Sequence, residues 1–260
     1  MSVQEKKTAI ITGSSSGIGL GLAEQFAKAG YNVVLNGLEK DGDQIAARVG
    51  EEYGTDTFFS SANMLNAEEI RAMVAETESR YGKVDVLINN AGVQYVSPID
   101  EFPEARWDLI IGVNLSSAFH TAKAVWPGMK ARGFGRIINI ASAHGLRASE
   151  YKSAYVAAKH GMVGLTKVLG LEGATCGITC NAICPGYVRT PLVEAQIKDQ
   201  AKAHGLSEEE VINKVMLAKQ AVKDFVSIEL LAQVALMLAS ETANTITGAA
   251  IPVEAGWTAQ

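Results

Sequence analysis

The sequence predicts an α/β fold: a single domain, residues 1–260, in which helices cover both faces of a doubly wound parallel sheet. Three observations support this prediction. Short apolar runs alternate along the chain with longer segments of helical pattern, and the connections between them are short and contain glycine. Hydrophobic residues make up 48% of the 260 residues and charged residues 20%, so the chain can bury one large core.

Seven short apolar runs are the candidate strands. In chain order they are Ala9–Thr12, Asn32–Leu35, Thr57–Ser61, Val84–Asn89, Gly135–Ile140, Thr179–Cys184 and Ala250–Pro252. Six helices are expected between or after them, at Ile18–Ala29, Asp41–Tyr53, Ala67–Tyr81, Ala105–Ala131, Ser153–Ala174 and Ser227–Leu238. This alternation predicts parallel strands, and ligands of such sheets bind outside the carboxyl ends of the strands.

One long segment does not fit the alternation. The stretch from about 190 to 225 is richer in charge and less periodic than the rest of the chain. It is predicted to be a small helical lid over the binding site. An ordinary pair of surface helices is the alternative.

A glycine-rich segment follows the first strand candidate. Gly13-Ser14-Ser15-Ser16-Gly17-Ile18-Gly19 leads from that strand into a helical run. A strand that passes through glycines into a helix N-terminus brings backbone N–H groups and the positive end of the helix dipole close to a bound pyrophosphate. The spacing is G-x-x-x-G-x-G rather than G-x-G-x-x-G, and glycine-rich turns also make tight bends without a ligand. Alone, the segment is a moderate signal for a Rossmann-type dinucleotide site.

The charge and hydropathy of the chain argue against several classes of partner. The net charge is −5 and the basic residues are scattered, which argues against nucleic acid. No apolar run reaches the roughly 20 residues that span a bilayer, and the polar start Ser2-Val3-Gln4-Glu5-Lys6-Lys7 lacks the apolar core of a signal peptide. We therefore expect a cytoplasmic protein with a small-molecule ligand and neither nucleic acid nor membrane as partner.

Three cysteines recur every fourth residue. Cys176, Cys180 and Cys184 could suggest a metal site, but the last two lie in a strand candidate and stand two pleats apart. Histidines or further cysteines, which tetrahedral zinc requires, are missing nearby. Reduced thiols and no metal are expected.

The most informative pair is Tyr155 and Lys159. Residues four apart on a helix lie one above the other, so the ammonium can reach the surroundings of the phenol. A neighbouring ammonium stabilises a phenolate and lowers a pKa that is near 10 in water, which makes the phenol usable as an acid-base group near neutral pH. Such pairs also arise by chance, but Ser142 and Asn114 lie upstream of this one.

Together these motifs resemble the short-chain dehydrogenases/reductases along essentially the whole chain. The matching residues are Thr12 to Gly19, Asn89-Asn90-Ala91-Gly92, Asn114, Ser142, Tyr155 with Lys159, and Pro185-Gly186. The resemblance implies that Ser142 hydrogen-bonds the substrate oxygen while Tyr155 removes the alcohol proton as hydride leaves for a nicotinamide. It also implies that Lys159 lowers the Tyr155 pKa and binds ribose, and that Asn114 helps to hold a water relay.

The resemblance also implies a set of cofactor-binding residues. These are Gly13, Ser15, Ser16, Gly17, Ile18, Gly19, Asn36, Gly37, Asn63, Met64, Asn90, Ala91, Gly92, Tyr155, Lys159, Pro185, Gly186, Val188 and Thr190. NAD is expected rather than NADP, because no Arg or Lys stands after the second strand or just before Gly17 to hold a 2′-phosphate. Two positions depart from the family. NAD-specific members often have Asp at the position of Gly37, and family members commonly have Asp at the position of Asn63.

The expected substrate is a small carboxylic acid. Cationic and amide donors to a carboxylate would come from Gln94, His144, Lys152 and Gln196. An equally good interpretation is that Lys152 lies on the solvated surface and that His144 hydrogen-bonds within its loop. Within the family these residues resemble the bacterial D-3-hydroxybutyrate dehydrogenases, which implies oxidation of D-3-hydroxybutyrate by NAD⁺ to acetoacetate. The implied substrate-binding residues are Gln94, Ser142, His144, Lys152, Tyr155, Tyr187, Gln196 and Trp257. Tyr187 stands where related enzymes often have Trp.

The resemblance implies a homotetramer assembled partly through the helices Ala105–Ala131 and Ser153–Ala174, whose broad apolar faces are compatible with it. One alternative function is NADPH-dependent reduction of acetoacetyl-CoA or another 3-oxoacyl thioester, which should require a basic patch that the sequence lacks. A second is a noncatalytic dinucleotide-binding protein, which the retained Ser142, Tyr155 and Lys159 argue against.

Overall fold

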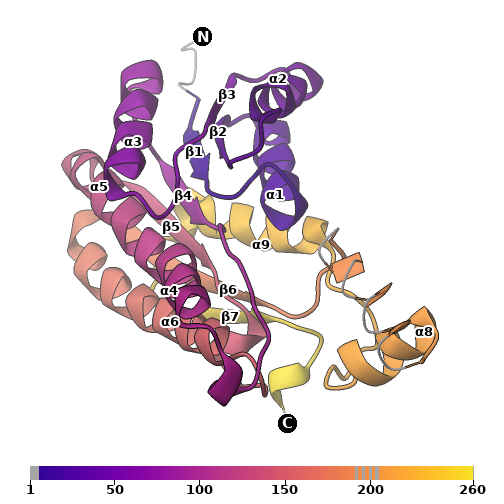
Figure 1. Cartoon of the computed structure of the whole chain (residues 1–260). Coiled ribbons are helices and arrows are strands. Elements are labelled where there is room, and N and C mark those ends of the chain that lie inside the picture. The colour runs from indigo at the N-terminus through magenta and orange to yellow at the C-terminus, as the bar shows by residue number, and fades with distance from the viewer. Residues whose placement is uncertain (1–5, 191–192, 195–196, 199–200, 203–204, 260) are drawn as a thin grey trace.

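The computed structural model describes residues 6–190, 193–194, 197–198, 201–202 and 205–259. Its centre is one seven-stranded parallel sheet in the order β3-β2-β1-β4-β5-β6-β7 (Figure 1). The strands are β1 (Thr8–Ile11), β2 (Asn32–Asn36), β3 (Thr57–Ser60), β4 (Val86–Asn89), β5 (Gly135–Ile140), β6 (Ile178–Pro185) and β7 (Ala250–Val253). The order reverses direction at β1, so the sheet is doubly wound and the predicted fold class is confirmed.

Helices cover both faces of this sheet. One layer holds α1 (Gly17–Lys28), α2 (Gly42–Tyr53) and α9 (Ile228–Ala239), and the other holds α3 (Ala67–Tyr81), α4 (Glu104–Ile111), α5 (Ser117–Arg132) and α6 (Ser153–Gly173). Figure 1 shows α9 beside α1, on the side of the sheet away from α5 and α6. Within the described residues, no helix combines the length and the apolar character that crossing a bilayer requires.

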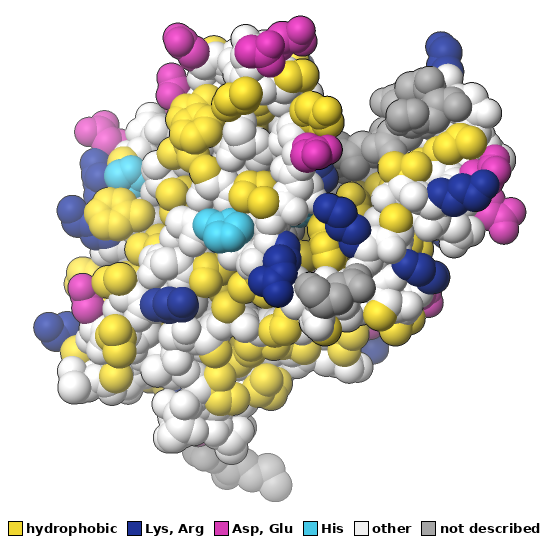
Figure 2. All heavy atoms as spheres, turned by 90° about the horizontal axis from the view of Figure 1, so that it is seen from below, with side chains coloured by type: hydrophobic (Ala, Val, Ile, Leu, Met, Phe, Trp, Pro, Cys, Tyr) yellow, Lys and Arg dark blue, Asp and Glu magenta, His cyan; other side chains and the backbone are white. Residues whose placement is uncertain are grey.

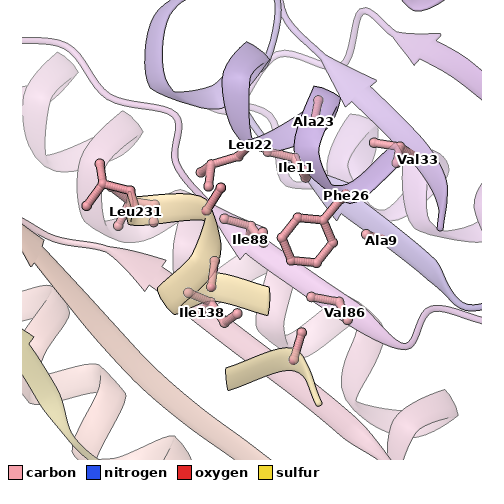
Figure 3. Close-up of a cluster of buried hydrophobic side chains, with 14 of the residues drawn as sticks. Ala9, Ile11, Leu22, Ala23, Phe26, Val33, Val86, Ile88, Ile138 and Leu231 are labelled. Carbon is pink, nitrogen blue, oxygen red and sulfur yellow. The ribbon is translucent and has the colours of Figure 1, made fainter. Parts of the chain in front are cut away.

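Alternation along the strands divides the core into two main clusters. Ala9 and Ile11 belong to the cluster under α1 and α9, whereas Ile10 between them belongs to the cluster under α3 and α5. Figure 3 shows the first cluster, in which the fully buried Phe26 of α1 lies among side chains of the central strands. Burying a side chain of this size contributes about 1.5–3 kcal/mol.

A polar network crosses the second cluster and ties α6 to the sheet. The Asn89 amide of β4 donates to Asn139 of β5 across 2.8 Å and accepts from Thr121 of α5 across 2.6 Å. The Asn139 amide in turn donates to Thr166 of α6 across 2.8 Å. All four side chains are buried, and their polar atoms satisfy one another.

The sequence predicted one helix over Ala105–Ala131, and the structure instead has two. A π-helical turn, Gly112–Ser116, separates α4 from α5 and carries Asn114. At Gly112 an added Cβ would lie 2.5 Å from the Leu65 side chain, so the chain passes close to its neighbour there. Single π turns inside helices insert one extra residue and often occur at functional sites.

The region predicted as a lid contains the short helix α8 (Glu208–Val211), which stands away from the sheet (Figure 1). A capping box between Ser207 and Glu210 begins this helix. Val211 and Met216 are buried in a small cluster against which Tyr187 packs. The buried Gln220 at the end of the region accepts a hydrogen bond from the Tyr187 N–H across 3.1 Å. The region is therefore attached to the strand end that carries Tyr187.

Candidate active site

The glycine-rich turn after β1 opens into the N-terminus of α1. Gly13 has φ +61°, and a Cβ there would lie 2.8 Å from the Ala91 Cα; a Cβ at Gly19 would lie 2.2 Å from the Gly13 oxygen. The side chain of the N-cap residue Ser16 makes no capping hydrogen bond, and the first turn of α1 holds no acidic residue. Backbone N–H groups at this helix end thus remain available to an anion, so the residues present fit a pyrophosphate.

A cleft of about 570 Å³ runs from this turn along the carboxyl ends of the strands. It is lined by every residue predicted for the dinucleotide except Val188: Gly13, Ser15, Ser16, Gly17, Ile18, Gly19, Asn36, Gly37, Asn63, Met64, Asn90, Ala91, Gly92, Tyr155, Lys159, Pro185, Gly186 and Thr190. Val188 lines a smaller cavity next to it.

Asn36 organises one end of the cleft. Its side chain accepts from the Gly13 N–H across 3.2 Å and donates to the Ser60 and Ala62 carbonyls across 3.0 and 2.9 Å. These contacts join the ends of β1, β2 and β3. The Asn63 side-chain oxygen nearby already accepts from the Leu65 N–H across 3.0 Å, which leaves one lone pair of this oxygen for the predicted contact with adenine.

The same end of the cleft holds a carboxylate that sequence reasoning missed. Glu39 lines the cleft two residues beyond Gly37, and an added Cβ at Gly37 would meet both the Glu39 carboxylate and the Ser15 hydroxyl. A hydrogen bond from Ser15 is the largest cause that lowers the pKa of Glu39, so the group is a carboxylate at neutral pH. The sequence pattern places the family's acidic residue at position 37, whereas in this chain the carboxylate of Glu39 lies beside Gly37.

Ser142, Tyr155 and Lys159 meet at the other end of the cleft. Ser142 follows β5 and begins the short 3-10 turn Ala143–Gly145, while the other two face it from the first turns of α6. The Lys159 ammonium donates to the Ile140 carbonyl across 2.7 Å and lies 5.7 Å from the Tyr155 ring centroid. The predicted proximity of Tyr155 and Lys159 is thus present in the structure.

The electrostatics at this end differ from the sequence prediction. Burial lowers the pKa of Lys159 to about 8, and burial raises the pKa of Tyr155 although the nearby Ser142 hydroxyl acts in the opposite direction. The spacing on the helix predicts that the ammonium lowers the Tyr155 pKa. Desolvation of the phenolate is the largest influence on the Tyr155 pKa, and the Lys159 ammonium donates to the Ile140 carbonyl.

Asn114 is a buried residue that holds the chain segment after β4. It is fully buried and does not line the cleft; its side chain accepts from the Val93 N–H across 2.8 Å and donates to the Val93 carbonyl across 2.9 Å. Both polar atoms of the side chain therefore pair with the backbone of the segment after β4, as the backbone of a neighbouring strand would.

A second cavity of about 160 Å³ adjoins the cleft at Ser142 and Tyr155. Of the predicted substrate residues, Gln94, Ser142, His144, Lys152, Tyr155, Tyr187 and Trp257 line it, and Gln196 lies outside the described residues. Val193 also lines it and was not predicted. The Trp257 ring stacks on Tyr187 at 6.0 Å and contacts His144 edge-on at 4.9 Å, so aromatic rings close one side.

Charge in the small cavity comes from Lys152. Its ammonium lies 5.9 Å from the Tyr187 ring centroid, and no carboxylate among the described residues forms an ion pair with it. Burial and the neighbouring Lys219 lower the pKa of Lys152. Figure 2, a view from below, shows basic side chains beside the recess between the body of the molecule and the lid region.

Of the two interpretations of His144, the structure favours a hydrogen-bonding group of the loop. Burial, followed by the charge of Lys152, lowers the pKa of His144 to about 3, so the ring is neutral at physiological pH. Its two nitrogens lie 3.4 Å from the Ser142 hydroxyl and 3.0 Å from the Ser149 hydroxyl. The imidazole is thus a polar wall of the cavity.

The cysteines lie outside this chemistry. Cys176, Cys180 and Cys184 are free thiols, and burial raises the pKa of Cys180 to about 12 and that of Cys184 to about 11. Within the part of the chain that is described, no group of three or more metal-binding side chains is present.

Comparison with known proteins places this geometry in a family. Residues 7–201 match the family model described as short chain dehydrogenase. A protein from Rhizobium meliloti (strain 1021) named D-beta-hydroxybutyrate dehydrogenase is 54% identical over 257 residues, which cover 98% of this chain and 99% of that protein. A protein of the same name from Cupriavidus necator is 48% identical over 255 residues, 98% of each chain.

A solved structure also matches this chain over its whole length. A crystal structure of an actinorhodin polyketide ketoreductase variant with NADPH is 34% identical, covers 100% of both chains and superposes with a TM-score of 0.93. The family model over residues 7–201 and the relatives and solved structure over nearly the whole sequence agree, and the chain belongs to the short-chain dehydrogenase family of dinucleotide-binding oxidoreductases.

Proposed function

We propose that this protein oxidises D-3-hydroxybutyrate to acetoacetate with NAD⁺, and catalyses the reverse reaction as well. The observation that carries the proposal is the cavity of about 160 Å³ in which the Lys152 ammonium lies with Tyr155 and Ser142. A small hydroxy acid needs such a place, with a cation for its carboxylate and an acid-base group for its hydroxyl. The names of the two relatives support the same substrate.

Each residue in the cavity has a task in this reaction. Ser142 hydrogen-bonds the substrate oxygen, and Tyr155 takes the hydroxyl proton during oxidation or returns it during reduction. Lys159 stabilises the phenolate that forms, and Lys152 with Gln94 holds the carboxylate. A bound oxidised nicotinamide dinucleotide would accept the hydride and add positive charge at this end of the cleft. Burial of Tyr155 makes its phenolate depend on these nearby positive charges.

The choice of NAD over NADP rests on charge at the far end of the cleft. The described residues that line this end, from Asn36 to Glu39, include a carboxylate and no cation. A carboxylate accepts hydrogen bonds from ribose hydroxyls and repels a 2′-phosphate. The ketoreductase of similar structure was solved with NADPH, so fold alone does not determine the choice.

A homotetramer is part of the proposal. Large apolar side chains are exposed on α5 and α6, where Phe119 is 45%, Val168 51% and Leu171 79% exposed. Exposed apolar residues that gather on helix faces often mark subunit contacts. Light scattering coupled to size exclusion should give four times the mass of one chain, and a monomer mass would reject the tetramer.

Initial rates of NADH or NADPH formation with D- and L-3-hydroxybutyrate, each with NAD⁺ and with NADP⁺, test the function directly. Turnover of the D acid with NAD⁺ alone is the expected result. The competing function, NADPH-dependent reduction of acetoacetyl-CoA, is tested in the same preparation. Activity on the thioester with NADPH, and none on the hydroxy acid, would keep the family and reject both the substrate and the cofactor.

A further inference from the structure

A chain of polar contacts leads from Ser142 away from the cleft. The Ser142 hydroxyl lies 3.4 Å from Nδ1 of His144, and Nε2 of the same ring lies 3.0 Å from the Ser149 hydroxyl. The Lys219 ammonium donates to the Ser149 hydroxyl across 3.4 Å, although the two residues are 70 positions apart in sequence. Four side chains thus connect the reacting end of the cleft to the lid region.

The chemistry of these groups sets the direction of the protons. An ammonium has donors only, so the Ser149 oxygen accepts from Lys219, and the Ser149 proton is then directed at Nε2 of His144. The buried imidazole is neutral and carries one proton, which this arrangement places on Nδ1. With the opposite tautomer, the Ser149 oxygen would accept from both Lys219 and Nε2, and the partly exposed Ser149 hydroxyl would donate to solvent and no longer to the ring.

The tautomer decides what Ser142 can do. Its oxygen receives Nδ1–H of His144 and also the backbone N–H of His144, which lies 3.1 Å away. A hydroxyl oxygen has two acceptor sites, so both are then filled by His144. The Ser142 proton remains, and it faces the cleft that Ser142 shares with Tyr155. With the other tautomer, Nδ1 would accept this proton and remove it from the reaction.

We propose that Lys219 and Ser149 are positioning residues that fix His144 in the Nδ1-protonated tautomer and so keep the Ser142 proton available for the substrate oxygen. The inference rests on the proposed function in one respect, the hydrogen bond from Ser142 to the reacting oxygen. Neither Lys219 nor Ser149 is among the described residues that line the two cavities, and both reach the Ser142 hydroxyl through His144. Lys219 also lies 5.8 Å from the Trp257 ring centroid and lowers the pKa of Lys152. Lys219 belongs to the lid region, so the direction in which the Ser142 hydroxyl donates its proton depends on that region lying against the site.

The direct test observes the imidazole nitrogens of His144. The full-length protein, labelled with ¹⁵N-histidine, contains four histidines, and His144→Asn assigns the signals by removing one set. Long-range ¹H–¹⁵N spectra should show a protonated Nδ1 and an unprotonated Nε2 in the unsubstituted protein. Lys219→Glu replaces the donor with an acceptor, so it should move the proton to Nε2. A ring already protonated at Nε2 in the unsubstituted protein would overturn the proposal.

Two further variants control this experiment. Lys219→Arg keeps a donor at the end of the chain and should retain the Nδ1 proton. Lys214→Met removes an exposed lysine of the same region, paired with Glu210 across 2.8 Å, and should leave the His144 signals unchanged. A tautomer that is the same in Lys219→Glu and in Lys214→Met would also reject the proposal.

Kinetics of Ser149→Ala provide the second readout. This variant breaks the chain without changing a charge, and it should lower kcat for D-3-hydroxybutyrate about tenfold, the effect of one lost hydrogen bond, with KM nearly unchanged. A raised KM with unchanged kcat would assign Ser149 to substrate binding and contradict the proposal. The NMR measurement needs no turnover, so it decides the proton positions even where the substrate assignment fails.

Discussion

Lys152→Met removes the one charge that the proposed carboxylate site depends on. Methionine keeps most of the aliphatic stem, so packing near Tyr187 is preserved while the ammonium is lost. Hydrogen bonds to charged groups contribute about 1.5–3 kcal/mol. Lys152 is only partly buried, which favours the lower half of that range. A loss of about 2 kcal/mol corresponds to a rise of about 30-fold in KM for D-3-hydroxybutyrate.

The assay compares the acid with its methyl ester, which has the same hydroxyl and no carboxylate. Initial rates of NADH formation should show the large rise in KM for the acid and a change of less than about threefold for the ester. Lys123→Met, which removes an exposed lysine on α5 that lies over Phe119, is the matched control and should leave both values unchanged. Equal changes for acid and ester would refute the assignment of Lys152 to the carboxylate.

The pH dependence of KM gives an independent check. Burial and Lys219 lower the pKa of Lys152, so its charge is lost at a lower pH than that of an ordinary lysine. The KM of the acid should therefore rise with increasing pH below the usual range of lysine titration. Lys152→Met should not show this rise, and a rise of the same size in that variant would contradict the explanation.

Three further predictions concern other residues. Tyr155→Phe should reduce turnover by at least about 100-fold while NADH still binds, as fluorescence titration would show, because only the acid-base hydroxyl is lost; substantial residual turnover would remove Tyr155 from this role. Glu39→Lys should raise kcat/KM for NADP⁺ relative to NAD⁺ about tenfold, and Glu39→Gln should raise it less, in paired rate measurements; an unchanged ratio in both would exclude Glu39 from cofactor choice. His144 has a folded pKa of about 3 against 6.5 in the unfolded chain, so the stability it contributes is present above pH 6.5 and is lost as pH falls toward 3. Urea unfolding should show a slope of about 1.4 kcal/mol per pH unit in that window that is absent from His144→Gln, and identical slopes would argue against the lowered pKa.

Local sequence patterns were sufficient for much of this molecule. The seven strands, the glycine turn and the pair Tyr155 and Lys159 depend on residues close in sequence, and the structure contains all of them. The π turn Gly112–Ser116 was not predictable in the same way. It interrupts the helical pattern by one residue only, and a partner 21 positions away, Val93, holds its Asn114.

Electrostatic expectations failed where tertiary structure determines the environment. The sequence left open whether His144 is a donor to the substrate or a hydrogen-bonding group of the loop, because the lowering of its pKa comes from burial and from Lys152 and Lys219 on other segments. The Tyr155 pKa was misjudged for the same reason, since helix spacing reveals a neighbouring ammonium and not the loss of water. Lys219 and Ser149 carry no motif, and only the folded chain brings them together.

The network of Asn89, Asn139, Thr121 and Thr166 has a consequence for how the molecule opens. It joins β4, β5, α5 and α6 through the buried amides of Asn89 and Asn139, which would lose hydrogen-bond partners if one element detached. These four elements should therefore form one cooperative unit, in which amide hydrogens exchange with solvent only through global unfolding. Tyr155 and Lys159 begin α6, so the reacting groups belong to the slowest-exchanging part of the protein, whereas the lid region, with its own small cluster, can open at lower free energy.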